Sequence, residues 1–359
     1  QGIYISLADT TTIKGNKIGT DPGGSNDNGN GADGIKVGAT VTNLTIGGVL
    51  GSNEGNIISG NNDDGIEING SGSVFVKGNT IGLGLNGTTV IANSQYGIRI
   101  LTASNTIGGS GPEKNIISGN TLSGVFISGA AASANAISYN RIGLSADGST
   151  AKANGSNGIT VSTSAANTNI LSNQISGNVG NGIDIPSDAG DGTTISGNTI
   201  GLANDGTTVV ANSNHGINSA RKVTIGDASD DTKINVISGN TQSGIHISTA
   251  TASGTVIANN VIGMDKLGTP TKANQANGIL VDSSAVNVTI GSVSGTTQVI
   301  GYKDGQNAIK VDGAATTNVK IAKNKFIRNT GSATSITVAM TNGGNGGLSG
   351  NDAITVATS

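Results

Sequence analysis

Acidic side chains are the residues of this sequence best suited to chemistry, because carboxylates can bind a metal ion or transfer a proton. They form three groups, which are Asp63, Asp64 and Glu67; Asp227, Asp230 and Asp231; and Asp21, Asp27 and Asp33. Calcium needs about six to eight oxygen ligands, and no group matches an EF-hand loop or the glycine-rich calcium nonapeptide. We therefore expect solvated turns and no cofactor, with one calcium site as the alternative. Its candidate ligands are Asp63, Asp64, Asp227, Asp230 and Asp231.

Arginine, histidine and aromatic residues are too few to indicate an active site. The arginines and histidines are Arg99, Arg141, Arg221, Arg328, His215 and His246. Neither histidine has an acidic neighbour in sequence, and Tyr96 and Tyr139 are isolated. No nucleophile elbow, phosphate-binding loop or zinc spacing occurs. We expect the histidines, Arg99 and Arg141 to be surface residues, and the sequence favours a protein that is not an enzyme.

The composition excludes several classes of protein. The net charge is −3 and the pI is about 5.3, so no basic surface exists for nucleic acid or an anionic membrane. No apolar run approaches the length of a membrane span, and the absence of cysteine excludes a disulfide framework. The hydrophobic fraction of 34%, with Ile and Val at regular intervals, argues against a disordered linker. The chain begins at Gln1 without a leader, which indicates a processed product or a fragment.

Short strings recur along the chain and define an internal repeat of about 60 residues. The string N-x-I-S-G-N, or a near copy, begins at Asn56, Asn115, Asn173 and Asn235. The string I-x-G-N-x-I-G begins at Ile13, Val76, Ile137, Ile195 and Ile257. The step Gly-Ile-x-Ile or a variant recurs at half that period, at Gly34, Gly65, Gly97, Gly124, Gly158, Gly182, Gly216, Gly244 and Gly278. Because shorter and longer steps alternate, each unit consists of one short and one long coil.

Each coil contains three short apolar segments separated by Gly and Asn, which tolerate the positive φ of tight corners. Alternate residues in these segments are Ile or Val, so one side chain faces inward and the next outward. The outward position of the Gly-Ile segment is polar in many coils, with Lys36, Glu67, Arg99, Asp184, His246 and Lys310. We predict an all-β, right-handed parallel β-helix, a three-sheet solenoid of about 12 coils of roughly 30 residues. It forms one domain over 1–359, with regular coils over 1–312 and degenerate terminal coils over 313–359.

Asparagine stands four residues before the Gly-Ile step in nine successive coils. These residues are Asn30, Asn61, Asn93, Asn120, Asn154, Asn178, Asn212, Asn240 and Asn274, and Asp304 takes the place in the tenth coil. Stacked Asn amides can donate to and accept from their neighbours above and below. We interpret the column as a structural asparagine ladder, with a row of ligand sites as the alternative. A second column, Asn16, Asn79, Asn140, Asn198 and Asn260, is expected in the long coils only.

The same strings resemble the pectate-lyase-like right-handed β-helix repeats of large bacterial secreted and surface proteins. The match consists of N-V-I-S-G-N at 235–240, G-N-K-I-G-T-D at 15–21 and N-T-I-G-G at 105–109. It covers residues 1 to about 312 and departs at 170–172, where Leu-Ser replaces Gly-Gly. The resemblance implies the architecture and an extracellular or cell-surface location. Because the same solenoid carries lyases, hydrolases, adhesins and inert spacers, it does not choose among their functions.

We therefore expect a structural protein, either an adhesin shaft or a subunit that assembles head to tail into a filament or surface layer. Residues 2–5 already fit the repeated strand and 352–356 are strand-like, so neither end carries a cap. Uncapped ends predict end-to-end self-association or contact with neighbouring solenoid segments. The alternative is a polysaccharide-binding or polysaccharide-degrading protein with glycans as partners. Its rim would be formed by the long-coil turns 83–91, 144–152 and 202–210.

Overall fold

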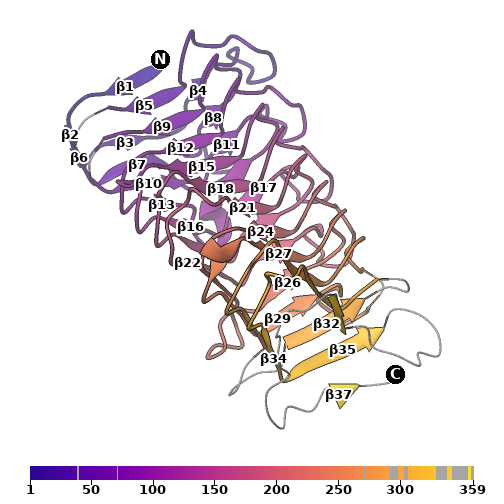
Figure 1. The fold of residues 1–359 in the computed structure, drawn as a ribbon. Helices are drawn as coiled ribbons and strands as arrows, with labels where there is room; N and C mark the ends of the chain where they lie inside the picture. Colours follow the sequence, from indigo (N-terminus) through magenta and orange to yellow (C-terminus); the bar gives the residue numbers. More distant parts are fainter. Residues whose placement is uncertain are drawn as a thin grey trace.

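The chain winds into a right-handed parallel β-helix, a stack of coils with a short strand on each of three sides (Figure 1). The computed structural model describes residues 1–38, 40–70, 72–270, 272–291, 298–302, 306–328, 338–341 and 355–356. Three parallel sheets result, which we call sheets I, II and III. The predicted three-sheet β-helix is therefore confirmed. Within the described residues, no helix is long and apolar enough to cross a membrane.

The described strands divide among the three sheets as follows. Sheet I contains 12 strands, which are β1 (Ile3–Ile5), β5 (Ile35–Val37), β9 (Ile66–Ile68), β12 (Ile98–Ile100), β15 (Val125–Ser128), β18 (Ile159–Ser162), β21 (Ile183–Ile185), β24 (Ile217–Ser219), β27 (Ile245–Ser248), β30 (Ile279–Asp282), β33 (Ile309–Asp312) and β36 (Val338–Thr341). Sheet II contains 11 strands, which are β3 (Thr12–Ile13), β7 (Leu44–Gly47), β10 (Val74–Lys77), β13 (Thr106–Ile107), β16 (Ala136–Ser138), β19 (Asn169–Leu171), β22 (Thr193–Ser196), β25 (Val223–Ile225), β28 (Val256–Ile257), β31 (Thr289–Gly291) and β34 (Lys320–Ala322).

Sheet III contains 12 strands, which are β4 (Lys17–Ile18), β8 (Ile57–Ile58), β11 (Thr80–Ile81), β14 (Ile116–Ile117), β17 (Arg141–Ile142), β20 (Gln174–Ile175), β23 (Thr199–Ile200), β26 (Asn235–Ile237), β29 (Asn260–Ile262), β32 (Gln298–Tyr302), β35 (Asn324–Arg328) and β37 (Thr355–Val356). The remaining elements are a two-stranded pair and two short 3-10 turns, namely β2 (Ala8–Asp9), β6 (Val41–Thr42), η1 (Gly111–Glu113) and η2 (Ala250–Ala252).

The inward residues of the strands form one continuous apolar core. In sheet I, Ile66 lies opposite Ile35 in one neighbouring coil and Ile98 in the other, and all three are fully buried. Burying each such side chain stabilises the fold by about 1.5–3 kcal/mol. The glycine of the Gly-Ile step has a steric role, because a Cβ on Gly65 would lie 2.6 Å from the carbonyl oxygen of Gly97. Glycine therefore recurs where the coils approach this closely, and Ala308 takes its place before β33.

The polar turns of the long coils form a second stack outside the three sheets. Isolated antiparallel bridges close them as hairpins, at Thr20–Asp27, Leu83–Val90, Leu144–Ala151 and Leu202–Val209. The backbone N–H of Ala146 donates to the carbonyl of Gly87 at 2.9 Å, and Asn204 donates to Gly148 in the same way at 2.9 Å. Each hairpin thus bonds to that of the next long coil across the intervening short coil. Arg141 lies beneath this stack, where its guanidinium donates to the carbonyl of Ala146 and to Oδ1 of Asn204.

The predicted asparagine column is a continuous run of buried hydrogen bonds in the structure. Eight bonds of 2.7–2.9 Å connect the amide Nδ2 of each residue from Asn30 to Asn240 with Oδ1 of its counterpart in the next coil, ending at Asn274. Asn93 illustrates the pattern, since its Nδ2 also donates to the carbonyl of Ile58 at 3.0 Å and its Oδ1 also accepts the backbone N–H of Asn61 at 3.1 Å. The column therefore links the asparagine side chains to one another and to backbone groups at the corner of each coil.

The second asparagine column contains more residues than we expected from the sequence. Asparagines of the short coils, the first residues of the N-x-I-S-G-N strings, alternate with those of the long coils. The ladder consists of Asn16, Asn56, Asn79, Asn115, Asn140, Asn173, Asn198, Asn235, Asn260, Gln298 and Asn324, joined by bonds of 2.8–3.1 Å. The prediction that this column occurs only in the long coils was wrong. The strings N-x-I-S-G-N and I-x-G-N-x-I-G differ in sequence, but both place an Asn at the same corner of the solenoid.

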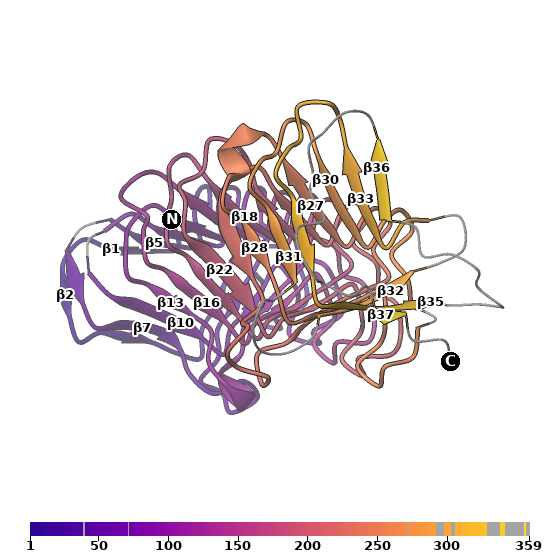
Figure 2. The same ribbon diagram turned by 60° about the horizontal axis from the view of Figure 1, so that its bottom comes forward.

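The coils continue beyond the regular repeats. β34 pairs in register with β31, and β35 pairs with β32, so residues 320–328 extend the same solenoid. β1 and β36 lie at opposite ends of the stack (Figure 2). Asp304 and most of the glycine-rich segment at 341–347 lie outside the described residues.

Candidate functional site

The outer face of sheet I brings together the ionisable side chains of its first coils. The residue before the glycine and the middle residue of the strand contribute from successive coils, and Asp63 contributes from one position earlier. Register places Lys36 beside Glu67 and Glu67 beside Arg99 on β5, β9 and β12. We call these three residues, together with Asp33, Asp63 and Asp64, the acidic cluster.

Ion pairs cross the coils of the acidic cluster. The ammonium of Lys36 lies 2.8 Å from Oε1 of Glu67 and 3.6 Å from Oδ2 of Asp33. Nη1 of Arg99 lies 3.6 Å from Oε2 of Glu67 and 4.0 Å from Oδ2 of Asp64. Glu67, which is 5% exposed, therefore interacts with both basic side chains.

The three aspartates of the cluster form a compact carboxylate group between two coils. One ligand atom from each of Asp33, Asp63 and Asp64 lies within 4.8 Å of the others, and Asp33 and Asp64 are 1% and 0% exposed. Oδ1 of Asp64 accepts the backbone N–H of Tyr96 at 3.0 Å, whereas its Oδ2 is buried without a hydrogen-bond partner. Burial raises the pKa of Asp64 to about 7. Burial, followed by the charges of Glu67 and Asp63, also raises the pKa of Asp33.

From the sequence we grouped Asp33 with Asp21 and Asp27, not with Asp63 and Asp64. Asp21 instead accepts hydrogen bonds within its own hairpin, from the backbone N–H groups of residues 25 and 26 at 2.7 and 3.1 Å. Asp33 and Asp64 each stand immediately before the glycine of a Gly-Ile step. Because equivalent positions stack in a solenoid, this shared position could have identified the pair.

The other predicted metal ligands are not brought together. Asp227 accepts the backbone N–H of residue 229 at 3.0 Å, and Asp230 accepts that of residue 232 at 2.9 Å, as in ordinary Asx turns. Lys233 lies 3.8 Å from Asp227 and 3.2 Å from Asp230, while Asp231 contacts Asn259 at 3.4 Å. Within the described ranges, only Asp33, Asp63 and Asp64 form a group that could hold a metal ion.

An aromatic pair adjoins the acidic cluster. The rings of Tyr96 and Phe126 stack with their centroids 4.3 Å apart and an interplanar angle of 5°. Phe126 lies opposite Arg99 in the neighbouring strand β15. The expectation that Tyr96 is isolated was therefore wrong, because its partner comes from the next coil.

A second polar network lies on the outer face of β21, β24, β27 and β30. Nε2 of His246 lies 2.9 Å from Oδ1 of Asp282, and its Nδ1 lies 2.8 Å from Oδ1 of Asn218. The amide of Asn218 in turn donates to Asp184 at 2.8 Å. Neither histidine has an acidic neighbour in sequence, but His246 has one across the coils, and the centroid of the His215 ring lies 4.7 Å from that of His246.

His215 is held in its neutral form. The backbone N–H of Ser243 donates to its Nδ1 at 3.2 Å, so this nitrogen carries no proton. Burial, followed by the positive charge of His246, lowers the pKa of His215 to about 4. The ring is therefore uncharged at neutral pH.

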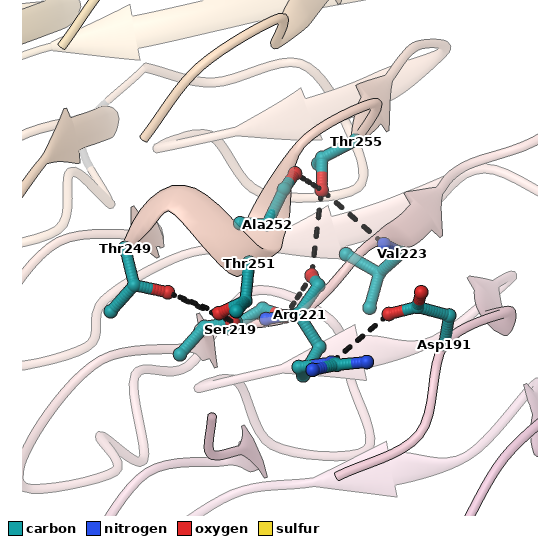
Figure 3. Close-up of polar contacts among 9 residues, drawn as sticks. Asp191, Ser219, Arg221, Val223, Thr249, Thr251, Ala252 and Thr255 are labelled. Atoms are coloured by element: carbon teal, nitrogen blue, oxygen red, sulfur yellow. Dashed lines mark hydrogen bonds and ion pairs between the residues drawn. The ribbon is translucent and has the colours of Figure 1, made fainter. Parts of the chain in front are cut away.

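Arg221 lies at the corner between sheets I and II, where it contacts other residues of the chain (Figure 3). Its Nε lies 3.0 Å from Oδ1 of Asp191, and its carbonyl accepts the hydroxyl of Ser219 at 2.9 Å. The hydroxyls of Thr249 and Thr251 donate to the carbonyl of residue 220 at 3.0 and 2.6 Å. These contacts connect neighbouring corners and leave Arg221 no evident role toward a ligand.

Two of the long-coil turns border a groove. The polysaccharide hypothesis predicted that these turns form the rim of such a groove. A cavity of about 550 Å³ lies over the first strands of sheet III, and hairpin residues Leu85, Asn86, Gly87 and Ala146 contribute to its wall. The turn at 202–210 does not contribute. Lys17 is the one ionisable residue of the lining, and its ammonium donates to the carbonyl of residue 22. The groove therefore contains no acid–base pair.

Comparisons with known proteins assign no family. No family model matches the chain, and no curated protein matches it. Among solved structures, it is similar to the crystal structure of alginate lyase from Paenibacillus sp. str. FPU-7, with a TM-score of 0.44 and 14% sequence identity over 95% of this chain and 89% of that chain. A likeness this distant assigns neither a family nor an activity to the chain.

Proposed function

We propose that this chain is a structural β-solenoid, a rigid segment of a secreted or cell-surface protein such as the shaft of an adhesin. The observation that carries the proposal is the pair of asparagine ladders. Their amides are buried and use their donors and acceptors on neighbouring coils. Such side chains present nothing to a ligand, and their bonds exist only while the coils are stacked.

A shaft must hold two ends of a molecule at a fixed separation, and the geometry suits this task. The hydrogen bonds of all three sheets and both ladders connect each coil to the next, so bending would have to lengthen many of them at once. The apolar core is continuous through the stack, which leaves no hinge between packed units in the described coils.

The test is a panel of polysaccharides incubated with the purified protein, with product formation and electron micrographs as the two measurements. A structural solenoid is expected to release no product from any polymer and to appear as straight rods. Rods joined end to end would support the expected self-association. Turnover of a polymer that is lost in an Arg99→Ala variant would contradict the structural proposal.

Polysaccharide binding or cleavage is the second candidate, favoured by the aromatic pair beside the acidic cluster. The half-buried rings of Tyr96 and Phe126 offer an apolar surface of the kind that packs against sugar rings. Lys36 and Arg99, whose side chains are 26% and 37% exposed, would add hydrogen-bond donors for sugar hydroxyl groups beside these rings.

Retention on immobilised glycans tests this candidate. Tyr96→Ala should weaken retention at least tenfold, because it removes half of the aromatic surface. Tyr139→Ala is the matched control, since Tyr139 is 42% exposed and lies outside the site. Equal retention of the two variants, or no retention of the unmodified protein, would remove the candidate.

A further inference from the structure

The carboxylates of Asp33, Asp63 and Asp64 converge at one point between consecutive coils. Asp33 precedes β5, whereas Asp63 and Asp64 precede β9, so the group joins neighbouring turns of the solenoid. The backbone contributes to its shape, since the N–H of Asp64 donates to Oδ1 of Asp33 at 3.3 Å. When all three carboxylates are ionised, these oxygen atoms, which lie within 4.8 Å of one another, repel each other unless a positive charge lies between them.

The basic residues nearby leave part of this charge uncompensated. The acidic cluster contains four carboxylates and two basic side chains, so it carries a net charge of −2 when all six are ionised. Lys36 and Arg99 both direct their closest contacts to Glu67, at 2.8 and 3.6 Å. No ion pair reaches Asp63 within the part of the chain that the structure describes.

The buried Oδ2 of Asp64 is the second, independent indication of a ligand. This residue is 0% exposed, and its Oδ1 accepts the N–H of Tyr96, whereas its Oδ2 has no hydrogen-bond donor and lies 4.0 Å from Nη1 of Arg99. A buried carboxylate oxygen without a donor destabilises the folded state, because it has lost the water that would otherwise hydrate it. Such an atom has a stabilising partner if a cation occupies the space that it faces.

We propose that Asp33, Asp63 and Asp64 bind one divalent cation, calcium, between the coils of β5 and β9. A charge of +2 would balance the net charge of the cluster, and Oδ2 of Asp64 would be its innermost ligand. Calcium accepts six to eight oxygens in irregular geometry, whereas magnesium requires a near-ideal octahedron, so three carboxylates and water suit calcium better. The half-exposed Asp63 leaves a route for the ion from solvent. The site depends on neither the shaft nor the polysaccharide candidate.

Bound calcium would join the two coils and should therefore stabilise the folded chain. Ligands that bind only the folded state raise the unfolding temperature in proportion to the logarithm of their concentration. Extracellular calcium modules bind with dissociation constants of about 10⁻⁴–10⁻³ M, which sets the concentrations to examine.

The experiment is a calcium titration of the full chain after treatment with EDTA, by calorimetry and by thermal unfolding. The unmodified protein should bind about one calcium ion and unfold at a higher temperature as calcium is added. Asp63→Asn and Asp64→Asn should each weaken binding at least tenfold. Asp230→Asn removes an exposed carboxylate of a solvated turn and should bind calcium as the unmodified protein does.

Two results would overturn the proposal. One is the absence of both heat and thermal shift in the unmodified protein at calcium concentrations up to about 10 mM, ten times the weakest dissociation constant expected. The other is undiminished binding by Asp63→Asn. Because Asp63 is half-exposed and makes no ion pair with a described residue, this variant remains informative even if Asp64→Asn does not fold.

Discussion

Buried amide side chains carry much of the specificity of this molecule. A hydrogen bond between two neutral groups contributes only about 1 kcal/mol to stability, but a buried donor or acceptor left without its partner costs about 1–3 kcal/mol. Each ladder asparagine bonds to two neighbours, so its loss removes hydrogen bonds on both sides. The ladders therefore fix the register between coils, because a coil displaced by one residue would leave its amides unpaired.

Asn61→Ala should lower the free energy of unfolding by about 2–4 kcal/mol, because it removes two ladder hydrogen bonds and leaves one amide without its partner. Nδ2 of Asn30, now 2.7 Å from Oδ1 of Asn61, loses its acceptor, and Oδ1 of Asn93 loses the Nδ2 donor at 2.8 Å but keeps the backbone N–H of residue 61. Chemical denaturation followed by circular dichroism measures the loss. Asn62→Ala is the control, since Asn62 is adjacent but exposed. Equal effects of the two substitutions would show that the ladder does not stabilise the stack.

The neutral His215 makes stability depend on pH with a defined sign. Its folded pKa of about 4 lies below the ordinary 6.5, so the unfolded chain binds more protons between these values. Stability should therefore be complete above pH 6.5 and fall as the pH decreases toward 4, by about 1–3 kcal/mol. His215→Asn should flatten this part of the curve, because Asn occupies the position in other coils, as at Asn181 and Asn277. Unfolding at pH 7 and pH 4 gives the comparison, and an unchanged difference between the two proteins would refute this explanation.

Contacts between residues at the same position of successive coils were predictable from the sequence. Contacts between residues at different positions of the repeat were not. The column from Asn30 to Asn274 follows from spacing alone, because the repeat places each residue above its counterpart. His246 and Asp282 are offset by two residues in register, since His246 lies opposite Leu280. Such a diagonal contact depends on side-chain rotamers, which the sequence does not specify.

Among the structural elements, the strands were more predictable than the turns. Alternating Ile and Val together with the Gly-Ile step locate the strands of sheet I directly. The bonds between hairpins were not predictable, because they connect long coils across a short coil and use backbone carbonyls that carry no sequence signal. Their effect on sequence appears at Gly87, where φ is +67° and an added Cβ would lie 2.2 Å from Cβ of Ala146.

Gly87→Ala should therefore destabilise the protein through a clash as well as through backbone strain. Gly51 also has a positive φ, of +80°, but an added Cβ there would meet nothing within 4 Å. We expect Gly87→Ala to cost about 1–3 kcal/mol more than Gly51→Ala, the cost of overpacking a close contact. Denaturation curves of both variants give the difference. If the two costs are equal, the hairpin stack does not contribute to stability.

At the scale of the molecule, the described coils form a regular rod, and the function that we propose for it depends on the rigidity of that rod. Repetition made the architecture predictable from the sequence, because each coil can bury its apolar side chains only by stacking. Function was less predictable, since the acidic cluster and the aromatic pair combine residues from several coils. Asp33, for example, gained its significance only when the stack brought it to Asp64.

Distance measurement between two spin labels tests the rigid-rod account most directly. The chain has no cysteine, so Phe75→Cys and Val256→Cys provide two unique attachment sites, at positions now 38% and 37% exposed. Both residues lie in one row of sheet II, separated by the coils that contribute Thr106, Ala136, Asn169, Thr194 and Thr224. Six steps of about 4.8 Å predict one narrow distribution centred near 29 Å. A broad distribution, or several separate distances, would contradict the account of this chain as a rigid structural solenoid.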